Sequence, residues 1–161
     1  MLKTILASLL FTGLIFAQQT QVAVGASNTI FTFPEGWEVI YDAEAEMHQA
    51  INSDGTVTII LQELPATSDE IVAASRDGIL NTYTEVEFDE DKKDNFGGFD
   101  VTLMAAMGTN PDLESKVLIM VAVYTIDESN CVQFMCEVNS EPQETTMSQI
   151  KDIATSITKA D

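Results

Sequence analysis

Basic residues are scarce in this chain of 161 residues. Seven lysines and arginines stand against 26 aspartates and glutamates, which gives a formal net charge of −19. Nucleic acids and anionic membrane surfaces both require a basic footprint that neutralises phosphate, so the charge excludes them as partners. A protein partner that is steered by charge should therefore be basic. The 45% hydrophobic fraction nevertheless predicts a folded core, and the length fits one domain.

Only one long apolar run is present, and it lies at the start of the sequence. Lys3 precedes it, and polar residues from Gln18 onward end it after too few residues to span a bilayer. This pattern predicts a cleaved signal peptide over residues 1–17 and an exported protein, either periplasmic or extracellular. No cysteine directly follows the run to carry a lipid anchor. Residues 18–27 are small and polar, which predicts a flexible lead-in to a single domain over residues 28–161.

The two cysteines, Cys131 and Cys136, lie in one strand-like run. Five residues of extended chain separate their Cα atoms by about 16 Å, whereas a disulfide requires roughly 4.4–6.8 Å. The odd spacing also directs the two side chains to opposite faces of a sheet. We expect two buried thiols that do not pair with each other, with a bridge between chains or a metal site as the alternatives.

Alternating apolar residues and turn signals predict a sheet with two helices. Thr67 and Glu70 form a capping box before the first helix, and the charged run 89–94 is expected to be a turn. The second helix is expected to be capped by Ser140, with Pro142 in its first turn and Gln143 completing a capping box. Strands are expected over residues 29–33, 37–41, 47–52, 56–64, 84–88, 100–107, 116–126 and 131–138, and the first helix over residues 68–83.

This order of elements predicts one α+β domain. Consecutive strands joined by tight glycine turns are antiparallel, and the apolar stripes of the helices must be buried against the sheet. We therefore expect a central antiparallel β-sheet of about six to eight strands flanked by two helices. The nearly all-apolar segment 116–126 is typical of a strand that is covered on both faces.

Several of these segments resemble a known family. The stretch Ile30–Trp37, a strand followed by Pro-x-Gly-Trp, is similar to the start of the PsbP/DcrB-like family of small exported proteins. The hairpin at Asp54–Gly55, the turn at Phe96–Phe99 and the closing helix with Ala154–Ile157 follow the order of that family over roughly residues 28–158. The resemblance implies an α/β/α sandwich with a binding, docking or assembly role and no catalysis.

No catalytic constellation is recognisable in the sequence. The only histidine, His48, is expected to face solvent on a strand, and Gly97–Gly98 lacks the Lys-Ser/Thr of a phosphate loop. We predict a non-enzymatic module without a cofactor that docks another protein. A protein that binds a small ligand or a divalent cation between helix and sheet is the alternative. A hydrolase built on an acid pair or on His48 is a third interpretation.

Trp37 and Tyr41 are candidates for an interaction surface. Both follow the turn after the first expected strand, and both side chains combine apolar area with a polar group. Packing of Trp37 in the core is the alternative. Met104, Met107, Met120 and Met135 alternate with other apolar residues and are expected to fill the core.

A weak calcium site is predicted at Asp89, Asp91 and Asp94, since clustered carboxylates supply the hard oxygen ligands that calcium prefers. The match to a calcium-binding loop is poor, and a solvated acidic turn is the alternative. If the site exists, calorimetry with millimolar calcium should record heat that Asp91→Asn removes. A flat titration, or one that this substitution leaves unchanged, would contradict the prediction.

Overall fold

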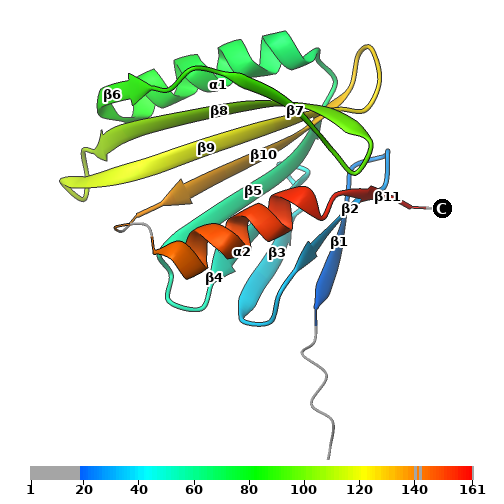
Figure 1. The fold of residues 1–161 in the computed structure, drawn as a ribbon, viewed down its shortest axis with the longest axis horizontal. Helices are drawn as coiled ribbons and strands as arrows, with labels where there is room; N and C mark the ends of the chain where they lie inside the picture. The colour runs from blue at the N-terminus through cyan, green and yellow to red at the C-terminus, as the bar shows by residue number, and fades with distance from the viewer. Residues whose placement is uncertain (1–18, 140, 142, 161) are drawn as a thin grey trace, which may run out of the picture.

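The structure of the protein is a computed structural model, which describes residues 19–139, 141 and 143–160. Within these residues the chain forms strands and two helices (Figure 1). The helices are α1 (Ser68–Thr82) and α2 (Glu144–Thr155). The strands are β1 (Thr20–Val24), β2 (Thr29–Phe33), β3 (Trp37–Asp42), β4 (Met47–Asn52), β5 (Val57–Leu64), β6 (Thr84–Phe88), β7 (Lys92–Phe96), β8 (Phe99–Asn110), β9 (Ser115–Thr125), β10 (Cys131–Val138) and β11 (Thr158–Lys159).

The main sheet has eight antiparallel strands in the order β3-β4-β5-β10-β9-β8-β6, with β7 also paired to β8. A smaller sheet has the order β1-β2-β11. Helix α1 packs on one face of the main sheet, against β6, β8 and β9. Helix α2 lies across the other face beside the smaller sheet (Figure 1). The predicted α+β fold, an antiparallel sheet flanked by two helices, is confirmed.

The core is divided into two clusters because the central strands are covered on both faces, as the apolar segment 116–126 predicts. Successive residues of β9 point to opposite faces. The α1 face of β9 carries Val117, Ile119, Val121 and Val123, which cluster with Ile71 and Ile79 of α1. The opposite face carries Leu118, Met120, Ala122 and Tyr124, which cluster with Ile150 and Ile153 of α2.

The start of α1 agrees with the sequence, whereas the start of α2 differs. Thr67 accepts a hydrogen bond from the Glu70 backbone and the Glu70 side chain accepts one from the Thr67 backbone, which is the predicted capping box. Gln143 has an extended backbone and is itself the N-cap of α2, without a side-chain bond. The predicted role of Gln143 inside the helix is therefore wrong, and Ser140 and Pro142 lie outside the described residues.

Two segments that were expected to be irregular are strands. The predicted flexible lead-in over residues 18–27 contains β1, whose Val22 and Val24 are buried in the core. The predicted turn over residues 89–94 contains the first half of β7. In both cases the strand forms because its backbone pairs with a neighbour, β2 or β8, although its side chains are mostly exposed.

Cys131 and Cys136 are free and buried, so the prediction that they do not pair is confirmed. They belong to different clusters, Cys131 on the α1 face and Cys136 on the α2 face, as the odd spacing requires. Burial raises the pKa of the Cys136 thiol to about 12. Cys136 is therefore protonated at neutral pH and behaves as a small apolar side chain.

The turn between β7 and β8 lies against the segment after α2. Gly97 and Gly98 both have positive φ, at 58° and 87°. A Cβ atom at Gly97 would lie 2.0 Å from the carbonyl oxygen of Ile157, whereas nothing lies within 4 Å of a Cβ at Gly98. The first glycine therefore permits close packing of the hairpin on the C-terminal segment, and the second only permits the turn.

This difference predicts unequal costs for two neighbouring substitutions. Gly98→Ala should lower the free energy of unfolding by about 1–2 kcal/mol, because it forces a non-glycine residue into the left-handed region. Gly97→Ala should cost about 1–3 kcal/mol more, because the backbone of Ile157 must also move. Urea unfolding of both variants measures the difference, and equal losses would contradict the packing role of Gly97.

Candidate binding surfaces

The structure separates the two aromatic residues that were predicted to form an interaction surface. Trp37 is only 8% exposed and packs beside Phe33, with ring centroids 5.8 Å apart. The surface role of Trp37 is therefore wrong and its alternative, core packing, is correct. Alternation places Trp37 and Tyr41 on the same face of β3, but only Trp37 packs in the core cluster, beside Phe33 of the smaller sheet. Tyr41 is 55% exposed on the same strand.

Strand β3 forms an edge of the main sheet, and no described strand pairs with its outer side. Ile40 and Tyr41 point to opposite faces of this strand and are 51% and 55% exposed. Glu38 and Asp42 are exposed on either side of them. We call the residues Glu38, Ile40, Tyr41 and Asp42 the β3 edge. It combines apolar side chains, acidic side chains and a row of backbone groups free of sheet pairing.

No described helix covers the face beside the β3 edge on the α1 side of the sheet. By the strand register, Ile40 lies opposite Gln49, and Gln49 opposite Ile60, so these side chains form one row on the α1 side of the sheet. Helix α1 packs on β6, β8 and β9 at the other end of the sheet. The half-buried Ile51 and Ile60 therefore continue the apolar surface that begins at Ile40.

His48 has a structural contact rather than a catalytic one. Its Nε2 atom lies 3.0 Å from the carbonyl oxygen of Ala23, and its ring lies 4.7 Å from that of Tyr41. The side chain lies on β4 beside β1 and is partly exposed to solvent. A backbone carbonyl supplies neither a nucleophile nor an orienting acid, so this contact links β1 to the main sheet without preparing a base.

The three aspartates of the predicted calcium site are not gathered. Asp91 accepts two hydrogen bonds from the Arg76 guanidinium at 2.9 and 3.0 Å, and Arg76 also lies over the ring of Phe88, 4.3 Å from its centroid. Asp94 belongs to β7. Among the residues that the structure describes, no group of three or more His, Cys, Asp or Glu side chains could hold a metal ion. Calcium binding by Asp89, Asp91 and Asp94 stays a prediction from the sequence.

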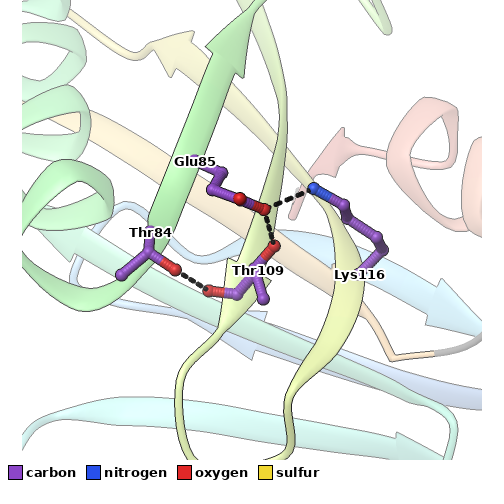
Figure 2. Close-up of polar contacts among 4 residues, drawn as sticks. All are labelled: Thr84, Glu85, Thr109 and Lys116. Carbon is purple, nitrogen blue, oxygen red and sulfur yellow. Dashed lines mark hydrogen bonds and ion pairs between the residues drawn. The ribbon is translucent and has the colours of Figure 1, made fainter.

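A second ion pair lies at the β6 edge of the main sheet, at the end away from β3. The Lys116 ammonium lies 2.9 Å from a carboxylate oxygen of Glu85, and the Thr109 hydroxyl donates to the same oxygen at 3.0 Å (Figure 2). These hydrogen bonds, with that from Lys116 the largest, hold the pKa of Glu85 below its usual value. In the described part of the chain, Lys92, Lys93, Lys151 and Lys159 make no such ion pair.

A groove lies on the α2 face of the sheet, between α2 and β7. Its volume is about 290 Å³. The floor is formed by side chains of β8 and β9, and the walls by α2 and by β7 with the segment before it. The apolar lining includes Phe96, Leu103, Ala105, Met120, Met147 and Ile150. Lys92, Lys151, Asp89 and Glu90 also line it. We call this the α2 groove.

The methionines divide between the core and the surface. Met104 is buried, as expected, but Met120 lines the α2 groove, and Met107 is 42% exposed further along β8. The expectation that all of them fill the core is therefore wrong for Met107. Alternation within a strand shows which residues share a face but not whether a helix covers that face. No signal in the sequence indicated the α2 groove, because its walls come from segments far apart in the chain.

No helix in the described part of the chain combines the length and the apolar composition that crossing a bilayer requires.

No protein-family model matches the chain, and no curated protein matches it. Several solved structures are similar to it, among them the following three. Cyanobacterial PsbP (CyanoP) from Synechocystis sp. PCC 6803 has a TM-score of 0.66 at 11% identity, over 92% of this chain and 96% of that one. LpqN of Mycobacterium tuberculosis, described as involved in cell envelope biogenesis, has a TM-score of 0.64 at 14% identity, over 89% and 91%. The Saccharomyces cerevisiae Ran-binding protein Mog1p has a TM-score of 0.58 at 15% identity, over 88% and 95%.

These similarities extend over nearly the whole of each chain, while the identities are too low to carry residue roles from one protein to another. The predicted resemblance is thereby confirmed at the level of the fold: the chain has a fold like that of PsbP.

Proposed function

We propose that this chain is an exported, non-enzymatic module that docks a basic partner protein along the β3 edge. The observation that carries the proposal is the edge itself, where Ile40 and Tyr41 are exposed between two acidic residues and the outer backbone of β3 has no strand partner in the described chain. An exposed sheet edge is a template for an added strand. The fold is compatible with this role, since one protein that shares it is a Ran-binding protein.

Charge decides which occupant the β3 edge favours. Glu38 and Asp42 lie beside the two apolar side chains, in a chain whose net charge is −19. A second copy of the chain would bring the same acids against them, and like charges that face each other across paired strands are destabilising. A basic extended segment would place opposite charges there and would be attracted over a longer range. We therefore assign the β3 edge to a basic partner rather than to self-pairing.

Export is supported by the relation between the leader and the fold. The expected cleavage after Ala17 leaves β1 intact, because β1 begins at Thr20. When the full chain is expressed in a secreting host, the mature protein should begin at Gln18. N-terminal sequencing or intact mass of the exported protein measures this, and an unprocessed Met1 in that fraction would contradict a cleaved leader.

Docking is tested with residues 18–161 as an immobilised bait and the exported fraction as the source of partners. Ile40→Ala with Tyr41→Ala should reduce recovery of the bound protein on the order of tenfold or more, because truncating apolar anchors at an interface costs more than about 1.4 kcal/mol. Leu80→Ala with Leu113→Ala is the matched control, since these two hydrophobic residues are similarly exposed but lie elsewhere. The control should bind like the wild type.

The charge of the partner is tested with the same bait. Recovery should fall as NaCl is raised from about 50 to about 500 mM, and Glu38→Gln with Asp42→Asn should flatten that dependence. The proposal would be overturned if recovery did not depend on the salt concentration. It would also be overturned if the β3 pair and the control pair of alanine substitutions reduced recovery equally. Sedimentation of the purified chain supplies a further check, because a dimer that only the β3 variant dissociates would assign the edge to a second copy.

A further inference from the structure

The α2 groove raises a question separate from docking, because it lies at the other end of the main sheet from the β3 edge. Its floor is on β8 and β9, which are separated from β3 by three strands in the sheet order. Apolar side chains from two strands, a helix and a hairpin converge there without filling the space between them. An apolar groove on a surface that is rich in carboxylates favours an apolar occupant.

The lining of the α2 groove favours a flexible apolar occupant. Met120 and Met147 line the groove, and their unbranched, polarizable side chains adapt to occupants of variable shape. A single acyl chain fits these properties better than a folded segment of a protein.

The two lysines at the groove identify the polar end of the occupant. Lys92 comes from β7 and Lys151 from α2, so they approach from opposite walls. Only six basic residues follow the leader, and two of them, Arg76 and Lys116, are committed to ion pairs. Two of the remaining four therefore line this one groove, and neither pairs with a described carboxylate. Ammonium groups in this position are suited to bind a carboxylate or a phosphate.

We propose that the α2 groove binds a single-chain amphiphile with an anionic head group, whose chain lies between α2 and β8–β9 and whose head group is held by Lys92 and Lys151. Asp89 and Glu90 line the same groove and oppose an anion. The two lysines must therefore outweigh two carboxylates. Substitution of either the lysines or the carboxylates should change the preference for an anionic head group. The occupant is a free amphiphile rather than an anionic membrane, because a net charge of −19 repels such a surface.

The proposal is tested on residues 18–161 with three twelve-carbon probes: dodecanoate, dodecyl phosphate and the uncharged dodecanol. The two anions are kept below their critical micelle concentrations, and dodecanol below its solubility limit. Displacement of the neutral dye N-phenyl-1-naphthylamine reports occupancy. Dodecanoate and dodecyl phosphate should displace the dye on the order of tenfold more effectively than dodecanol, the effect expected for about one charge-assisted contact.

Charge variants then separate the head group from the groove. Lys92→Gln with Lys151→Gln should reverse the preference, so that dodecanol binds more tightly than dodecanoate, because Asp89 and Glu90 remain. Asp89→Asn with Glu90→Gln should strengthen dodecanoate binding and leave dodecanol unchanged. All four side chains are exposed, so these variants should unfold at the wild-type temperature. Equal binding of dodecanoate and dodecanol by the wild type would overturn the anionic head group.

The location is tested by filling the groove. Ala105→Phe places a ring on its floor and should abolish displacement by all three probes, whereas Ala73→Phe, at an exposed position on α1, should have no effect. If Ala105→Phe lowers the melting temperature, Met147→Glu on the α2 wall replaces it. Binding that survives both groove variants, or binding only to phosphatidylglycerol vesicles and not to the free probes, would overturn the proposal. Neither result bears on docking at the β3 edge.

Discussion

Tyr124 joins three of the elements that lie on the α2 face of the sheet. This fully buried residue of β9 contacts Phe31 of the smaller sheet, with ring centroids 5.5 Å apart, and Phe96 of β7 at 6.5 Å. Its hydroxyl donates a hydrogen bond of 2.8 Å to the carbonyl oxygen of Ala154 in the last turn of α2. Burial raises the pKa of Tyr124, so the hydroxyl stays a donor throughout the physiological range. One side chain thus sets the positions of a helix, a hairpin and a second sheet.

The two proposed sites lie where the helices leave parts of the main sheet open. Helix α2 is held near Tyr124 and leaves part of β8 and β9 open, which becomes the floor of the α2 groove. Helix α1 packs over β6, β8 and β9 and leaves the surface beyond β5 open, which ends at the β3 edge. In the described part of the chain, the two helices and the smaller sheet leave parts of both faces of the eight-stranded sheet uncovered. The uncovered parts lie at opposite ends, so the sites do not compete for space.

Local signals in the sequence account for the central strands, the capping box at Thr67 and the separation of the two cysteines, because alternation and spacing are local properties. Strands β1 and β7 are not predictable from local patterns, because pairing with β2 and β8 makes them strands rather than their own side chains. The sequence leaves open whether Trp37 is buried, because a single strand does not show which of its faces will be covered. The α2 groove could not be predicted for a related reason. Lys92 and Lys151 are far apart in the sequence and line the same groove only after the chain has folded.

The smaller sheet has a consequence for the order of folding. It joins β1 and β2, near the start of the described chain, to β11 near its end, and the Ser156 hydroxyl accepts a hydrogen bond from the backbone of Thr32, 124 residues away. Contacts between such distant residues form only after both segments are present, and the entropy of closing the intervening chain delays them. A chain that crosses a membrane from its N-terminus cannot complete this sheet in transit. If this chain is exported as proposed above, its last segment, which carries β11, completes the smaller sheet only after translocation.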